Sequence, residues 1–178
     1  MKKILVLGAS SSKNSVNKML ATYAGQQCES FEKVILDLND FEMPIYSIDR
    51  EEGNDLPELA IQFVQTIESV DGVIVSLAEH NGSYTAAFKN ILDWASRHKK
   101  KLWSEKKMLL LSTSPGPRGA ATVMETAKLS FPHLGADIVA SYSLPSCFDN
   151  FSVDDGIKNE SIEHDFNDAL NTFITSLS

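Results

Sequence analysis

Residues 72–97 read GVIVSLAEHNGSYTAAFKNILDWASR and place a strand pattern directly before a helix pattern. The first six residues form a short, almost continuous apolar run, which predicts a buried strand over Gly72–Leu77. The apolar residues that follow Thr85 recur at the i, i+3, i+4 and i+7 spacing of a buried helix face, namely Phe88, Ile91, Leu92 and Ala95. A short apolar strand that leads into such a helix is typical of a parallel sheet covered on both faces.

The same alternation recurs along the whole chain of 178 residues. Strands are expected at Lys3–Leu7, Lys33–Leu38, Gly72–Leu77, Met108–Ser112 and Asp137–Ser143. Helices are expected near Val16–Gln26, Leu56–Val70, Thr85–His98, Ala120–Leu134 and Ser161–Leu177. Right-handed crossovers exclude most other topologies, so this pattern favours an α/β fold, a flavodoxin-like three-layer sandwich whose five-stranded parallel sheet has the order 2-1-3-4-5.

Neither a repeat nor a linker interrupts this pattern, and we expect residues 1–178 to form a single domain. Two segments have no clear periodicity, Asn39–Asp55 and Leu144–Glu160. Both are long for connections in a compact domain, and loops of this length are often functional.

Composition excludes several classes of protein. Hydrophobic residues make up 43% of the chain and charged residues 22%, as in ordinary globular proteins. The net charge of −8 argues against a nucleic-acid partner and against binding to an anionic membrane surface. No apolar run reaches the roughly 18 residues that a membrane span requires. Cys28 and Cys147 are too few for a disulfide framework, so we expect a reduced, cytoplasmic setting.

Ligands of such a sheet bind beyond the carboxyl ends of the strands, close to the switch in strand order. The loop after the first strand, Ala9–Asn17, offers hydroxyl groups and the free amides of a helix N-terminus, which suit a phosphate. An ordinary polar turn with Ser15 as the helix cap explains the same residues.

Two further loops end at the same edge of the predicted sheet. Residues 78–85 contain the turn-forming pair Asn81-Gly82 and could present backbone donors to a flat ligand, or could be a tight connection with a capping hydroxyl. The segment 113–119 has glycines that would let its backbone approach a ligand closely, although a simple Gly/Pro turn would look the same.

Motifs for other chemistries are absent from the sequence. It has no P-loop, no complete GxGxxG fingerprint and no GxSxG elbow, which removes support for nucleotide hydrolysis, a Rossmann domain and a serine hydrolase. The four histidines do not have the spacing of metal ligands, and we predict no metal site.

Taken together, the three loops resemble the NADPH-dependent FMN reductase family, whose members include quinone, azo-dye and chromate reductases. The resemblance extends to about Tyr142 and is strongest in residues 79–83 (EHNGS) and in the helix that follows, at Lys89-Asn90 and 93–97 (DWASR). It implies an FMN-binding domain whose cofactor contacts are Ser10, Ser12, Ser15, Val16, Asn17, Glu79, His80, Asn81, Gly82, Ser83, Ser114, Gly116 and Gly119. For Glu79 we expect a backbone contact to the flavin ring.

The resemblance also implies a function, an FMN-containing oxidoreductase. In the family's ping-pong scheme, hydride passes from NADPH or NADH to flavin N5 and then to an acceptor: a flavin, a quinone, an azo compound or a metal oxyanion. Because the cofactor carries this chemistry, no side chain is expected to be catalytic. The alternatives are a flavodoxin-like electron carrier or flavin-binding module, and a family member that has lost FMN. The resemblance further implies a homodimer or homotetramer, with Trp94 and Trp103 as candidate interface residues.

Overall fold

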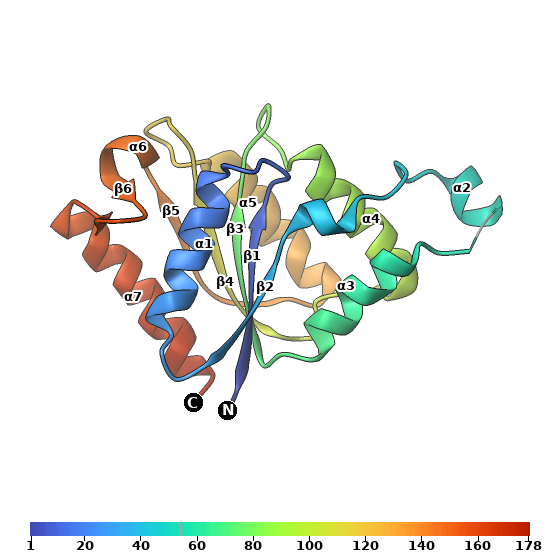
Figure 1. Ribbon diagram of the computed structural model, residues 1–178, viewed down its shortest axis with the longest axis horizontal. Coiled ribbons are helices and arrows are strands. Elements are labelled where there is room, and N and C mark those ends of the chain that lie inside the picture. Colours follow the sequence, from blue (N-terminus) through green and yellow to red (C-terminus); the bar gives the residue numbers. More distant parts are fainter. Residues whose placement is uncertain (54) are drawn as a thin grey trace.

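The computed structural model describes residues 1–53 and 55–178. Five parallel strands form its main sheet: β1 (Lys3–Ala9), β2 (Glu32–Leu36), β3 (Gly72–Leu77), β4 (Lys107–Thr113) and β5 (Asp137–Leu144). The strands are arranged β2-β1-β3-β4-β5, as shown in Figure 1. This order confirms the topology predicted from the sequence.

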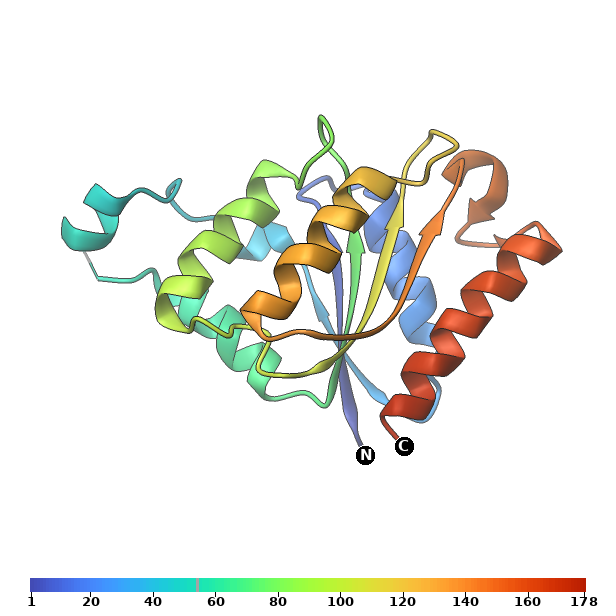
Figure 2. The same cartoon turned by 180° about the vertical axis from the view of Figure 1, so that it is seen from behind.

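Helices cover both faces of the sheet (Figures 1 and 2). One face carries α1 (Val16–Gln27) and α7 (Glu160–Ser176), and the other carries α3 (Glu58–Glu68), α4 (Ala86–His98) and α5 (Ala121–Ser130). Within the described part of the chain, no helix has both the length and the apolar character needed to cross a membrane.

Strand β1 shows why the chain forms three layers. Side chains alternate between the two faces of a strand, and here Leu5 and Leu7 pack with α3, α4 and α5, whereas Ile4 and Val6 pack with α1 and α7. All four side chains are at most 1% exposed. An apolar run without alternation is therefore what a strand buried on both faces requires.

Several predicted elements end earlier than expected, and two of them are followed by a 3-10 turn. The strand predicted over Lys33–Leu38 is β2, which ends at Leu36, because the Asp37 carboxylate accepts a hydrogen bond from the Asn39 amide and caps a 3-10 turn over Leu38–Phe41. The helix predicted over Ala120–Leu134 ends at Ser130, and a separate 3-10 turn follows over Phe131–Leu134.

The two irregular segments also contain short regular elements. The first includes α2 (Ile48–Gly53), on an arm that extends away from the sheet in Figure 1. The second includes α6 (Cys147–Asn150) and a small antiparallel pair, β6 (Phe151–Ser152) and β7 (Gly156–Ile157).

Gly8 allows α1 to begin close to the end of β1. A Cβ atom at this residue would lie 2.4 Å from the Cα atom of Lys18, in the first turns of α1. Only glycine permits this separation. The N-terminus of α1 is thereby held against the carboxyl edge of the sheet.

Candidate functional site

A hollow of about 260 Å³ lies at the carboxyl edge of the sheet, where the loops after β1, β3 and β4 come together. These loops are grouped at the top of Figure 1, together with α6. The hollow is lined by Ser10, Ser12, Asn14, Ser15, Val16, Asn17, Ala78, Glu79, His80, Thr113, Ser114, Pro115 and Phe148. Eight of the cofactor contacts predicted from the resemblance are in this set; Asn81, Gly82, Ser83, Gly116 and Gly119 are not.

The N-terminus of α1 provides the anion-binding chemistry of the hollow. The Ser15 side chain caps the helix by accepting a hydrogen bond from the Lys18 amide at 3.2 Å. The amides of Val16 and Asn17 belong to the first turn and have no acceptor among the described residues. No acidic side chain lies in this turn. Free amides and the positive end of the helix dipole favour an anion here.

The Asn17 side chain, in contrast, is used inside the protein. It is 2% exposed, and its Nδ2 donates to the Thr113 carbonyl oxygen at 3.0 Å. Its Oδ1 accepts from the Thr113 amide at 3.0 Å and from the Ser76 hydroxyl at 2.8 Å. Asn17 therefore joins α1 to the ends of β3 and β4, and only its backbone amide is available to a ligand.

Glu79 joins the loop after β3, which lines the hollow, to α5. Its Oε2 accepts a hydrogen bond from the Val123 amide at 2.9 Å, in the first turn of α5. The N-cap residue of that helix is Ala120, whose side chain cannot cap and whose φ of 64° lies in the left-handed region. The Glu79 carboxylate thus replaces the missing cap, a side-chain role that the sequence did not indicate.

Residues 80–83 form a two-residue hairpin. The His80 amide donates to the Ser83 carbonyl oxygen at 2.9 Å, and the Ser83 amide donates back to His80 at 3.1 Å. Asn81 and Gly82 have φ values of 53° and 74°, as a type I′ turn requires. The turn thus extends past the hollow, and of its residues His80 reaches the lining.

The glycines of the loop after β4 have different roles. A Cβ atom on Gly119 would lie 2.6 Å from the Leu144 carbonyl oxygen, so this glycine is required by packing against the end of β5. A Cβ atom on Gly116 would have only the Ser114 hydroxyl within 4 Å, at 3.8 Å. A side chain at residue 116 would therefore meet little, whereas Gly119 maintains the loop.

The segment after β5, within the irregular stretch Leu144–Glu160, forms a fourth wall that was not among the three predicted site loops. The Ser146 amide donates to the Gly116 carbonyl oxygen, and the Cys147 amide donates to the Ser114 carbonyl oxygen, both at 3.0 Å. These bonds fix α6 against the loop after β4 and place Phe148 in the lining of the hollow. The signal that could have found it is its place just beyond the carboxyl end of the fifth strand, where ligands of such sheets bind.

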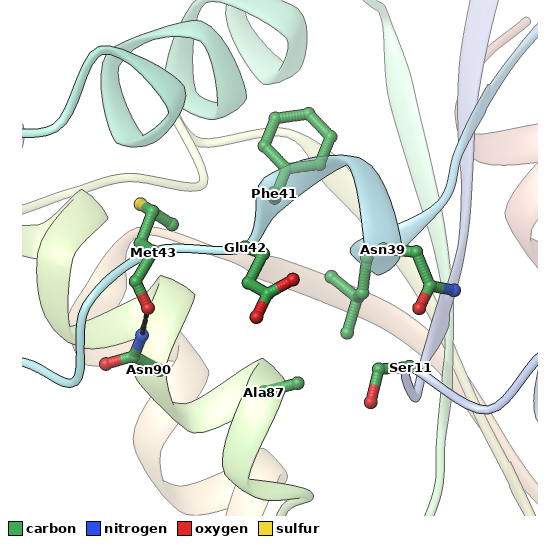
Figure 3. A pocket seen from close by; sticks show the side chains of 8 residues that line it. Ser11, Asn39, Phe41, Glu42, Met43, Ala87 and Asn90 are labelled. Carbon is green, nitrogen blue, oxygen red and sulfur yellow. Dashed lines mark hydrogen bonds between the residues drawn. The ribbon is translucent and has the colours of Figure 1, made fainter.

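A second hollow, of about 280 Å³, lies on the other side of the loop after β1, between Ser11, Glu42 and α4 (Figure 3). Asn90 lines it and holds the start of the arm: its Nδ2 donates to the carbonyl oxygens of Met43 and Pro44, and its Oδ1 accepts from an amide farther along the arm. The polar groups of the Asn90 side chain are thus engaged in holding the arm against α4.

Two other expectations can be compared with the structure. Trp94 and Trp103 are 2% and 0% exposed within the chain itself, so neither side chain is available to another subunit as the resemblance suggested. Among the described residues, no group of three or more His, Cys, Asp or Glu side chains could hold a metal ion.

Lys18, a charged residue beside the anion site, is paired. Lys18 forms an ion pair with Asp37, at the end of β2. The hydrogen bond from Lys18, together with one from the Asn39 amide, lowers the pKa of Asp37 to about 2. Lys18 is therefore occupied, and the donors facing the hollow from α1 are amides and hydroxyls.

Known proteins share both the sequence pattern and this architecture. The family model described as NADPH-dependent FMN reductase matches residues 2–149. A 2-hydroxy-1,4-benzoquinone reductase from Burkholderia sp. is 36% identical over 121 residues, or 67% of this chain and 64% of that relative, slightly less than two thirds of its length.

Solved structures resemble this chain over almost its whole length. The flavoenzyme NAD(P)H:(acceptor) oxidoreductase FerB from Paracoccus denitrificans has a TM-score of 0.77 and 26% identity, over 99% of this chain and 97% of that one. An FMN-dependent NADH-azoreductase from Bacillus anthracis, in complex with FMN, shares the fold with a TM-score of 0.64 and 14% identity, over 99% and 100% of the two chains. Because the family model covers well over half of its residues, the chain belongs to the NADPH-dependent FMN reductase family.

Proposed function

We propose that the chain binds FMN in the hollow formed by its loops and works as an NAD(P)H-dependent oxidoreductase. One observation carries the proposal. The loops after β1, β3 and β4 meet at a single hollow in which the free amides at the start of α1 face an open edge. A phosphate bound at the helix N-terminus would fix one end of the cofactor there.

The donors of the site fit this cofactor. The Val16 and Asn17 amides and the hydroxyls of Ser10 and Ser12 would hold the phosphate. Backbone groups of residues 79–83 and of 114–119 would face the ring. When bound, FMN supplies the hydride chemistry, accepting from NADPH or NADH and passing to an acceptor in a ping-pong scheme.

The size of the hollow bears on how the ring would lie. Its 260 Å³ is below the roughly 300–1,000 Å³ of pockets that enclose a drug-sized ligand. We infer that the hollow would hold the phosphate end of FMN, and that a volume this small would leave the ring accessible to a second substrate.

The donor, acceptor and assembly belong to the same proposal. FerB acts with NAD(P)H, and the Burkholderia relative reduces a benzoquinone. We extend both to this chain, with a flavin, a quinone, an azo compound or a metal oxyanion as acceptor. We further propose a single domain that forms a homodimer or homotetramer in the cytoplasm. Ile45 and Ile48 on the arm, 75% and 55% exposed, support an interface.

Absorbance spectroscopy tests the proposal. The purified protein is mixed with FMN, passed through a desalting column and titrated anaerobically with NADPH or NADH. We expect one FMN retained per chain and loss of the flavin band at a rate that supports turnover. Retained FMN that neither nucleotide bleaches would indicate the electron carrier instead. A chain that retains no FMN would contradict the proposal.

A further inference from the structure

We propose that Phe148 is an acceptor-binding residue, against whose ring a planar, uncharged acceptor of the quinone class stacks. This inference rests on the proposed oxidoreductase function and specifies which acceptor the site takes. It concerns a residue of the segment after β5, outside the three loops from which the site was predicted.

The location of Phe148 is the first observation. Phe148 lines the same hollow as the anion-binding residues, yet its side chain is 69% exposed. A large aromatic side chain at the rim can contact a ligand that enters the hollow. Its exposed surface becomes buried only when such a ligand binds.

The second observation is that this side chain is held outward by a fixed backbone. Cys147 and Phe151 on either side are 1% and 7% exposed and belong to the core between the sheet, α1 and α7. The hydrogen bonds from Ser146 and Cys147 to the loop after β4 fix the start of α6. Asn150 closes the turn through its Nδ2, which donates to the Pro145 carbonyl oxygen at 3.0 Å.

Backbone strain supports the same conclusion. Ser146 has a φ of 44°, in the left-handed region that residues other than glycine rarely adopt. Such a conformation is unfavourable and persists only where the surroundings impose it. The backbone that carries Phe148 is thus fixed before any ligand binds, which reduces the entropy lost on binding.

The charges at the rim select the kind of acceptor. Among the described residues that line the hollow, none is a lysine or an arginine. Asp149, next to Phe148, is exposed and adds a negative charge. An oxyanion gains nothing from the negatively polarised face of an aromatic ring, whereas an uncharged planar ring gains stacking with Phe148. The wall therefore favours a quinone over a metal oxyanion.

The first test is a binding measurement that requires no turnover. Dissociation constants for 1,4-naphthoquinone are measured by ligand-observed NMR on the protein with added FMN and no reductant, for the wild type, Phe148→Leu and Phe148→Tyr. We expect Phe148→Leu to weaken binding about fivefold and Phe148→Tyr to restore it, since an aromatic pair is worth about 1 kcal/mol beyond area burial. An unchanged constant in Phe148→Leu would overturn the inference.

Steady-state kinetics provides the second test. The overall reaction converts NAD(P)H, a proton and the quinone into NAD(P)⁺ and the hydroquinone. We expect the ratio of the KM for naphthoquinone to the KM for ferricyanide, an anionic acceptor that is not planar, to rise about fivefold in Phe148→Leu. Leu129→Ala, which changes a 75% exposed side chain on α5, is the control and should leave the ratio unchanged. An equal ratio in Phe148→Leu and the wild type would contradict the inference.

Failure of the proposed function has a separate signature. If the wild type takes up no FMN in a fluorescence titration, the oxidoreductase proposal fails and the acceptor role of Phe148 fails with it. If FMN binds equally to all variants and naphthoquinone binding does not distinguish them, only the inference about Phe148 fails.

Discussion

Replacing Asn17 with alanine should destabilise the protein strongly, because this side chain connects three elements. The substitution removes three hydrogen bonds, to both backbone groups of Thr113 and to the Ser76 hydroxyl. These two residues are 1% and 0% exposed, so water does not readily replace the lost partner. An unsatisfied buried group costs about 1–3 kcal/mol. Because the Ser76 hydroxyl can rotate toward another acceptor, we expect a total loss of about 3 kcal/mol.

Urea denaturation of the FMN-free protein, followed by tryptophan fluorescence, measures this loss. Asn14→Ala is a matched control, because Asn14 lies in the same loop, is exposed and has no hydrogen bond from its side chain among the described residues. We expect the control to change the free energy of unfolding by less than about 0.5 kcal/mol. A loss below about 1 kcal/mol for Asn17→Ala would refute the assignment of Asn17 as an internal connector.

Three further predictions concern single charged or nucleophilic groups. Glu79→Ala should lower the free energy of unfolding by about 1 kcal/mol through loss of the α5 cap, and Glu79→Gln by less; equal urea midpoints for the wild type and Glu79→Ala would contradict this. Because the folded-state pKa of Asp37, about 2, lies below its ordinary value of 3.8, its ion pair stabilises the protein above about pH 4 and loses this effect as the pH falls toward 2. Asp37→Asn should therefore lower the free energy of unfolding by about 1 kcal/mol at pH 6, after allowance for solvent screening, and by almost nothing at pH 2. An equal loss at both pH values would contradict the lowered pKa of Asp37. Burial raises the pKa of Cys28 to about 11 and also raises the pKa of Cys147. Both thiols should therefore resist a thiol reagent at pH 8 until urea is added. Fast labelling of the native protein would contradict the buried placement.

The sheet could be predicted from the sequence because burial on both faces leaves a continuous apolar run. In β1 and β3, this run is what packing against helices on two sides requires. Strand order then followed from the handedness of crossovers. The end of β2 could not be predicted, because it depends on the Asp37 side chain reaching its neighbouring amide, and an apolar residue, Leu38, continues the run beyond it.

The loops of the site could be located from the sequence, but the roles of individual side chains could not. Asn17 and Glu79 lie in the expected loops, yet their partners, Thr113 and Val123, are 96 and 44 residues away. No local pattern encodes such contacts. Phe148 was missed for a different reason: the segment around it has no periodicity, and only its backbone bonds to the loop after β4 bring it to the hollow.

A comparison of FMN with riboflavin is the sharpest test of a phosphate site at the start of α1. The two ligands share the ring and the ribityl chain, and only FMN carries the phosphate that the α1 N-terminus would hold. Dissociation constants are measured by quenching of flavin fluorescence on addition of the FMN-free protein. We expect FMN to bind at least ~100-fold more tightly than riboflavin. Several charge-assisted hydrogen bonds to the phosphate are together worth ~3 kcal/mol or more. Equal affinities, or no quenching by either ligand, would contradict the assignment of this hollow as the FMN site.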